Sequence, residues 1–314
     1  MMKFDLKYNI NNITFGEHRS GFKFIMELLQ QFECADGILL DGYLDYSFGW
    51  KLNILKSKNL LPYKRSWIGF VHNPPNIPPW VKTLSTEELV DCKDFKENLI
   101  LCKGIFTFSN YLTNKLKERL DVPIITLRHP TEFPDKVFNL NSFLKEKKII
   151  QMGSWLRCRS IFHELKATDY MKIQIIRRNS IKVFLDELKY FNITFKDIKN
   201  SDTSIVDFVD NNLYDNLLSS SVVFDNIFDS SANNTVIECI SRNTPIFINK
   251  LESIVEYLGD NYPLYYEDIN EVSEMLKDDL LIAKASLYLQ NLPIRYELKG
   301  EYFLKKLSDS LIFL

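Results

Sequence analysis

Short apolar runs and amphipathic stretches alternate along the chain. In the first part, continuous apolar runs of strand length lie near residue 38 and end at Val71, Phe108 and Leu127. Such runs are typical of strands in a parallel sheet that is covered on both faces. Helical spacing separates them, at residues 22–32 after Ser20 and at residues 110–120 after Ser109, and both serines are suitable N-caps. The alternation predicts a doubly wound α/β sheet.

The pattern lapses between Pro130 and Glu146 and restarts with the strand-like run KKIIQM. Further strands are predicted at residues 172–176 and 193–196, and helices at about 180–190, near Tyr214, at 270–292 and at 296–313. The sequence therefore predicts two Rossmann-like domains that face a cleft, of residues 1–140 and 141–295. Residues 296–314 have helical spacing and balanced charges, so we expect this helix to cross back and pack on the N-terminal domain. Peripheral contact with a membrane surface is the alternative for this helix.

Composition narrows the class of function. Lys and Arg number 39 and Asp and Glu 41, so the net charge is −2, which gives no overall attraction to nucleic acid. The five cysteines form no C-x-x-C pair, so neither a disulfide framework nor a zinc site is indicated. No run approaches the roughly 18 apolar residues of a membrane span. We expect a soluble, cytoplasmic protein.

The segment from Phe224 to Tyr266 carries the clearest chemical signal. A strand that ends at Phe224 leads into a polar loop, residues 225–234, and the loop opens a helix that contains Glu238. In open α/β sheets, ligands lie beyond the carboxyl ends of the strands. Glu238 has two possible roles. With Thr235 it fits a capping box at the helix start, or it accepts hydrogen bonds from ribose hydroxyls while the free helix amides bind phosphates.

At this segment the chain resembles a known family. Asn234-Thr235, Glu238, Thr244-Pro245 and Glu256-Tyr257-Leu258-Gly259 match, in order and spacing, the donor-binding segment of GT-B glycosyltransferases in the "glycosyltransferases group 1" set. The resemblance implies a nucleotide-sugar donor between two Rossmann-like domains, with Glu238 at the ribose. The donor-binding residues are then expected to be Gly153, Ser154, Arg157, Arg159, Ser230, Ser231, Asn233, Asn234, Thr235 and Glu238.

One departure from the family concerns the reaction's stereochemistry. Many retaining members carry another glutamate eight positions before the one at 238, where this chain has Ser230, with Asp229 beside it. Asp229 is a candidate substitute for the missing acid, and the backbone and hydroxyls of the loop are the alternative. Retention or inversion of configuration at the sugar is therefore undecided.

A basic loop, Gly153 to Arg159, follows the run KKIIQM. Glycine lets the backbone approach a ligand closely, and arginine offers a planar set of donors to phosphate oxygens. In the family, a basic residue of this loop neutralises the leaving diphosphate, and this catalytic role is carried over to Arg157 first and to Arg159 second. The alternative is a solvated loop with no special task.

Candidates on the acceptor side come from the first domain. His72 follows a buried strand and could take a proton from an acceptor hydroxyl, although such a histidine also commonly caps a turn. Trp80, in the proline-rich loop that follows, is expected to stack on a sugar ring. His18 lies in a loop with small residues before the first long helix, where an acceptor could approach, and His129 is expected to be structural.

Several motifs are missing from the sequence. There is no D-x-D, G-x-G-x-x-G, P-loop or G-x-S-x-G, which disfavours metal-dependent glycosyl transfer, dinucleotide oxidoreduction, NTP hydrolysis and serine hydrolysis. The sequence favours a glycosyltransferase that moves a sugar from a nucleotide-sugar donor to a hydroxyl of a glycan or lipid-linked acceptor, without metal or another cofactor. A nucleotide-sugar epimerase of the same fold and a non-catalytic binding or scaffold protein are the alternatives.

Overall fold

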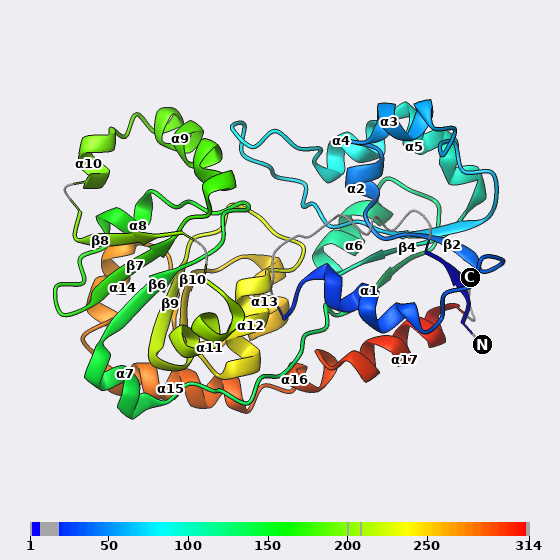
Figure 1. Cartoon of the computed structure of the whole chain (residues 1–314). Coiled ribbons are helices and arrows are strands. Elements are labelled where there is room, and N and C mark those ends of the chain that lie inside the picture. Colours follow the sequence, from blue (N-terminus) through cyan, green and yellow to red (C-terminus); the bar gives the residue numbers. More distant parts are fainter. Residues whose placement is uncertain (1, 7–18, 200, 208, 312–314) are drawn as a thin grey trace.

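Two separate parallel sheets organise the chain into two lobes (Figure 1). The computed structural model describes residues 2–6, 19–199, 201–207 and 209–311. Within these ranges, no helix has the length and apolar character needed to cross a membrane. The two predicted Rossmann-like domains are confirmed, since each sheet is built by strands that alternate with helices.

The N-terminal sheet has five parallel strands in the order β1-β2-β3-β4-β5. These are β1 (Phe4–Asp5), β2 (Ile38–Asp41), β3 (Trp67–Phe70), β4 (Cys102–Thr107) and β5 (Ile124–Thr126). Its helices are α1 (Phe22–Gln30), α2 (Leu44–Ser47), α3 (Leu52–Ser57), α4 (Thr86–Asp91), α5 (Lys93–Asn98) and α6 (Asn110–Lys117), with a 3-10 turn at Leu99–Leu101. As predicted, Ser109 caps α6, because its hydroxyl accepts from the Leu112 amide at 3.2 Å.

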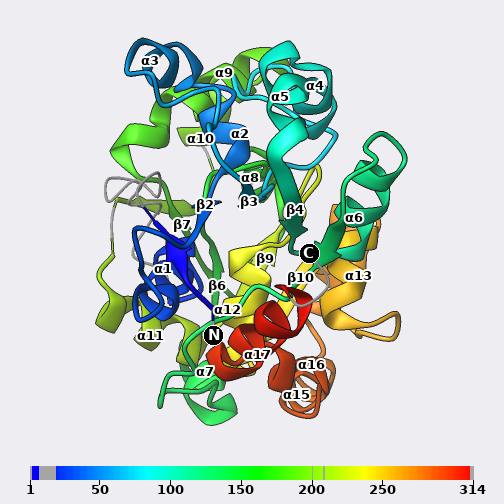
Figure 2. The same cartoon turned by 90° about the vertical axis from the view of Figure 1, so that its right-hand side faces the viewer.

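The two faces of this sheet are covered by different helices. Helices α2 to α6 pack on one face. Helix α1 and the C-terminal helix α17 (Gly300–Leu311) pack together on the other face (Figure 2). Phe303 and Leu307 of α17 are buried there in one cluster with Ile25 and Leu29. The expected return of the C-terminal helix to the N-terminal domain is therefore confirmed.

The C-terminal sheet has the strand order β11-β10-β9-β6-β7-β8, which is the Rossmann order. Its strands are β6 (Lys148–Gln151), β7 (Met171–Ile175), β8 (Thr203–Val206), β9 (Ser221–Asp225), β10 (Ile246–Asn249) and β11 (Tyr265–Tyr266). Its helices are α7 (Leu140–Glu146), α8 (Ile161–Glu164), α9 (Ile181–Tyr190), α10 (Phe195–Lys199), α11 (Asn211–Ser220), α12 (Asn234–Arg242), α13 (Glu252–Leu258), α14 (Ile269–Met275) and α15 (Asp279–Gln290). The strand order reverses between β6 and β9, so the ligand crevice is expected at their carboxyl ends.

Two predicted elements are wrong, and local capping explains both. Residues 193–196 were predicted as a strand, but α10 starts there instead. The Asp197 carboxylate accepts from the amide and the hydroxyl of Thr194, and the Thr194 hydroxyl accepts from the Asp197 amide. The single helix predicted at 270–292 is divided into α14 and α15, because the Asp278 carboxylate accepts from two amides at the start of α15. Capping residues thus overrode the apolar spacing in both places.

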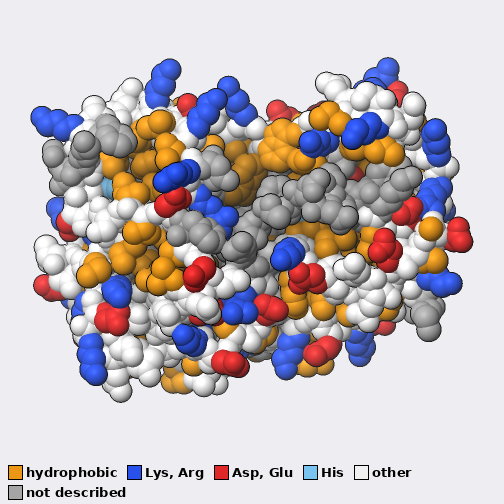
Figure 3. Space-filling view, in the orientation of Figure 1, with side chains coloured by type: hydrophobic (Ala, Val, Ile, Leu, Met, Phe, Trp, Pro, Cys, Tyr) orange, Lys and Arg blue, Asp and Glu red, His pale blue; other side chains and the backbone are white. Residues whose placement is uncertain are grey.

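The chain passes between the domains twice. Residues 127–139 connect β5 to α7, and α16 (Ile294–Glu297) leads from α15 into α17 along the bottom of the molecule (Figure 1). In the space-filling view, hydrophobic side chains gather on the upper part of both lobes (Figure 3). Residues that follow β3, β4 and β5 line one pocket together with residues that follow β6, β7 and β9, so the carboxyl ends of the two sheets face each other.

Candidate active site

A pocket of about 390 Å³ lies between the two domains. The N-terminal domain lines it with Phe22, Tyr43, Trp50, His72, Asn73, Pro74, Phe108 and His129. The C-terminal domain lines it with residues 152–157, Ile175, Arg177, Ser180, Val209, Tyr214 and residues 229–235. The loops after β6 and β9 are both in this lining, as the reversal of strand order requires.

The start of α12 points unpaired amides toward the pocket. Asn233 is the N-cap, and its side-chain oxygen accepts from the Val236 amide at 3.1 Å. The alternative of a Thr235 capping box is therefore wrong, because the N-cap lies two residues before the one that this box requires. The amides of Asn234 and Thr235 have no acceptor in the described part of the chain, and both residues line the pocket. A helix start of this kind favours a bound anion.

Arg157 lies beside this helix start with a fixed guanidinium. Its Nε donates to Asp225 Oδ2 at 2.8 Å, its Nη1 to the Trp155 carbonyl at 2.8 Å, and its Nη2 to Thr235 Oγ1 at 2.8 Å and Asn233 Oδ1 at 3.3 Å. The residue is 8% exposed and lines the pocket. The structure thus brings the predicted cation and the predicted helix amides to one wall.

Asp225 and Gly153 hold Arg157 from two sides. Asp225 is fully buried at the end of β9, and burial raises the pKa of its carboxyl to about 6 although Arg157 opposes this shift. Gly153 has a φ of +83°, and a Cβ there would lie 2.8 Å from the guanidinium carbon of Arg157. Glycine is needed at this position both for its backbone conformation and for the close approach of Arg157.

Three predicted donor-binding serines lie in the lining, together with a cation that was not predicted. Ser154, Ser230 and Ser231 line the pocket, and Ser230 Oγ bonds Ser253 Oγ at 3.0 Å. Arg177, which follows β7, lines the pocket as well. The sequence held a signal for it, since two arginines follow the predicted strand at residues 172–176 and so stand at a carboxyl end.

Asp229 joins the two domains at the edge of the pocket. Its Oδ2 accepts from the Asn76 amide at 3.0 Å, from Asn76 Nδ2 at 2.9 Å and from the Tyr111 hydroxyl at 3.0 Å. Its Oδ1 accepts from the Ser230 amide at 2.8 Å. Burial raises the pKa of this carboxyl. Asp229 lines the pocket, but both of its oxygens are engaged.

His72 lies in the pocket as a neutral ring. Its Nε2 is 2.8 Å from the Gly42 carbonyl, so this nitrogen carries the proton and Nδ1 has the lone pair. The ring stacks on Tyr43 with 4.0 Å between centroids, and burial lowers its pKa to about 3. His129 also lines the pocket, and burial lowers its pKa to about 4. A proton acceptor with so low a pKa is weak at neutral pH.

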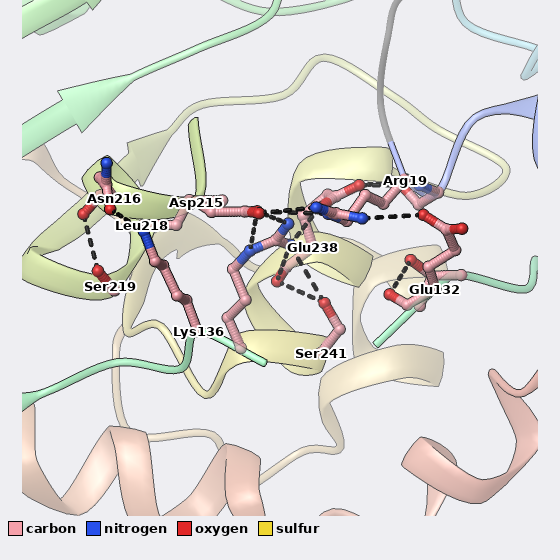
Figure 4. Close-up of polar contacts among 12 residues, drawn as sticks. Arg19, Glu132, Lys136, Asp215, Asn216, Leu218, Ser219, Glu238 and Ser241 are labelled. Atoms are coloured by element: carbon pink, nitrogen blue, oxygen red, sulfur yellow. Dashed lines mark hydrogen bonds and ion pairs between the residues drawn. The ribbon is translucent and has the colours of Figure 1, made fainter. Parts of the chain in front are cut away.

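Glu238 is not among the residues that line the pocket. Figure 4 shows it in a cluster of polar side chains with Arg19 and Asp215. Its Oε1 accepts from both the amide and the hydroxyl of Ser20, each at 2.8 Å, and its Oε2 pairs with Arg242. Ser20 is consequently not the N-cap of α1, a position held by Gly21. Asp215 connects Arg242 to Arg19, whose Nη2 lies 2.8 Å from Asp215 Oδ2. Glu238 thus belongs to a buried charged network between the domains.

Arg159, Trp80 and His18 are the remaining candidates. Arg159 is 1% exposed, pairs with Glu187 on α9 and stacks over Phe184, so it lies in the domain interior and not in the pocket lining. Trp80 contacts three aromatic rings of the C-terminal domain, those of Tyr190, Phe191 and Phe228, and is also outside the lining. His18 lies outside the described residues.

In the described ranges, no group of three or more His, Cys, Asp or Glu side chains is arranged to hold a metal ion.

No family model and no curated protein matches the sequence, so the similarity to known proteins is one of structure. Anabaena HepE, solved with UDP and glucose, superposes with a TM-score of 0.66 at 7% identity, over 88% of this chain and 78% of its own. Sucrose-phosphate synthase of Thermosynechococcus elongatus gives 0.63 at 9% identity, over 92% and 77%. The chain has the GT-B fold.

TarM superposes with a TM-score of 0.60 at 13% identity, over 87% of this chain. The match covers 54% of TarM, so this chain spans about half of TarM's length. Staphylococcus aureus TarM has been solved with UDP, and HepE with UDP-glucose. The GT-B architecture that the segment at residues 224–266 indicated is therefore confirmed.

Proposed function

We propose that the protein is a glycosyltransferase that moves a sugar from a nucleoside-diphosphate sugar to a hydroxyl of a glycan or lipid-linked acceptor. One observation carries the proposal: the free amides at the start of α12 and the buried guanidinium of Arg157 meet on one wall of the interdomain pocket. That pair suits a diphosphate. The GT-B structures solved with UDP and UDP-glucose support the same donor class.

The chemistry asked of this wall is electrostatic. When the bond between the anomeric carbon and the diphosphate oxygen breaks, negative charge grows on that oxygen. Arg157 and the amides of Asn234 and Thr235 stabilise it without reorganising, because Arg157 is already held by Asp225 and Trp155. The cation for the leaving group is supplied by the chain itself, so the proposed reaction runs without a metal ion or another cofactor.

Two further residues, Asp229 and His72, position the domain walls and the sugar. Asp229 binds Asn76 and Tyr111 across the domain boundary and so holds the walls together over the donor. The free Nδ1 of His72 accepts a hydrogen bond from a sugar hydroxyl in the pocket, a role that requires the neutral ring which burial produces. Holding the two substrates in register in this way supplies much of the barrier reduction in group transfer.

The test is a binding and turnover series with a matched control. UDP-, GDP-, ADP- and CMP-sugars are screened by thermal shift in the presence of EDTA, because a ligand of the folded state raises the Tm. We expect one base to stabilise the protein, Arg157→Gln to abolish that shift, and Arg178→Gln to retain it, since Arg178 has 90% of its side chain exposed. Mass spectrometry then follows the donor with and without acceptors. No Tm shift with any donor, loss of activity in EDTA, or conversion of the donor to an isomer without acceptor would refute the proposal.

A further inference from the structure

The two walls of the pocket differ in charge. Among the residues that the structure describes, the charged side chains that line it are Arg157, Arg177 and Asp229, all from the C-terminal domain. The eight described residues of the N-terminal domain in the lining include no Lys, Arg, Asp or Glu. The two histidines among them, His72 and His129, are neutral at pH 7, because burial lowers their pKa to about 3 and about 4. The described part of the N-terminal wall is therefore uncharged.

A row of aromatic rings leads from this wall to the C-terminal domain. His72, Tyr43, Trp50 and Trp155 line the pocket, and Tyr46 joins Tyr43 to Trp50 from outside the lining. Successive ring centroids lie 4.0 Å apart for His72 and Tyr43, 6.3 Å for Tyr43 and Tyr46, 5.6 Å for Tyr46 and Trp50, and 6.4 Å for Trp50 and Trp155. Trp50 comes from the loop after α2 and Trp155 from the loop after β6, so the last contact crosses the domain boundary. We call these five residues the aromatic row.

The outer end of the aromatic row is open to solvent although it is built rigidly. Trp50 is 46% exposed and Trp155 is 39% exposed, and both line the pocket. The indole of Trp50 is oriented by a hydrogen bond from its Nε1 to the Lys82 carbonyl at 3.2 Å. Singly exposed apolar residues are common on protein surfaces, but these two indoles contact each other across the domain boundary and both line a pocket, an arrangement that indicates a ligand surface.

A saccharide fits this surface. The faces of aromatic rings carry negative charge density, and the C–H groups on one side of a pyranose ring pack against them as weak donors. An anionic acceptor would need a cation on its wall, whereas the charged residues here lie opposite, where the donor's diphosphate is proposed to bind. The aromatic row therefore favours an uncharged sugar over a phosphate-bearing group.

We propose that the aromatic row is the acceptor site and that the acceptor is an uncharged oligosaccharide. Its reacting sugar lies at His72 and Tyr43, and a neighbouring sugar lies at the mouth against Trp50 and Trp155. This inference rests on the proposed function, of which it names the acceptor class. It moves the acceptor-binding tryptophan from Trp80, which is packed into the C-terminal domain, to Trp50.

Saturation-transfer NMR with defined probes tests the inference. Maltotriose, cellotriose and the trimer of N-acetylglucosamine serve as uncharged probes, and glucose 6-phosphate as the anionic one. The variants are Trp50→Ala, Trp155→Ala and the conservative Trp50→Phe, with Tyr296→Ala as control because Tyr296 is 64% exposed on the distant α16. UDP affinity is measured for each by calorimetry, and circular dichroism checks that each is folded.

We expect at least one uncharged trisaccharide to bind through its ring protons. Trp50→Ala and Trp155→Ala should each weaken it by about tenfold, the loss that follows removal of one aromatic stacking contact, whereas Trp50→Phe and the control retain most of the affinity. UDP affinity should not change. The inference is overturned if no uncharged probe binds, if only glucose 6-phosphate binds, or if the tryptophan variants lose UDP and keep the saccharide. Failure of the wild-type protein to bind any nucleotide would instead refute the proposed function. Saccharide binding is measured without nucleotide, so the two failures are distinguishable.

Discussion

Replacing Arg157 by glutamine tests at once how the donor wall is built and what it binds. The Arg157 and Asp225 side chains are 7% and 0% exposed, so their ion pair is buried. Asp225 Oδ1 already has no hydrogen-bond partner in the described chain. Removing one member of a buried pair costs about 3–5 kcal/mol. Because Asp225 is able to take up a proton instead of remaining charged, we expect the low end, about 3 kcal/mol at pH 7.

The pH dependence identifies the cause of this loss. In the wild-type protein, the Asp225 pKa of about 6 lies above its unfolded value, so the stability from its protonation is present below about pH 4 and is lost as the pH rises through 6. Without Arg157 the folded pKa of Asp225 rises further, so protonation stabilises the variant over a wider pH range than it does the wild type. The variant should therefore be less destabilised at pH 5 than at pH 7.

Urea unfolding at pH 5 and pH 7 measures both quantities. The double variant Arg157→Gln with Asp225→Asn has no buried acid at this site, so it should recover most of the stability and lose the part of the pH dependence that comes from Asp225. It should not recover binding of UDP, because the guanidinium is still missing. A loss under about 1 kcal/mol at pH 7 would contradict the buried-pair argument, and UDP binding by the double variant would contradict the diphosphate role.

Three further changes test neighbouring features. Burial raises the pKa of Asp45 to about 7, so its stabilising protonation is lost as the pH rises from about 4 through 7, and Asp45→Asn should flatten the pH dependence of urea stability over that range. Tyr257→Phe leaves the Phe108 carbonyl without its 2.7 Å interdomain bond and should cost about 1–3 kcal/mol, measured by urea unfolding. Asp229→Asn weakens the bond to Tyr111 and should lower kcat more than UDP affinity.

Each of these has a plain contrary result. An unchanged slope of stability against pH in Asp45→Asn would mean that the carboxyl is ionised throughout the range. A Tyr257→Phe protein as stable as wild type would mean that water replaces the lost donor. Equal losses of kcat and UDP affinity in Asp229→Asn would place Asp229 in donor binding and not in positioning.

The sequence predicted the sheets well because their strands are continuous apolar runs that only a covered parallel sheet explains. It also found the loop at residues 229–235 and Arg157, since both follow strands whose carboxyl ends must share an edge. The family resemblance ranked Arg157 before Arg159, but the sequence gives no physical reason for that choice. That choice depends on the left-handed backbone of Leu156, with a φ of 54°, and on Glu187, which accepts from the Arg159 amide.

The acceptor side was harder to predict for a physical reason. Trp80 stands in a conspicuous proline-rich loop, whereas Trp50 follows a helix of four residues with no motif around it. What gives Trp50 its significance is its partner Trp155, more than a hundred positions away and in the other domain. Glu238 shows the same limit, because its contact with Ser20 depends on how the two domains meet. Contacts between domains leave no periodic signal in one sequence.

The place of α17 has a consequence for how the chain folds during synthesis. Phe303 and Leu307 complete the core against α1, yet the ribosome makes them only after the whole C-terminal domain. Until then the nascent N-terminal half exposes the apolar face that α17 will cover, and such a surface is prone to aggregation or chaperone capture. The last helix thereby makes completion of the first domain wait for the second, and the two halves are expected to unfold together rather than in sequence.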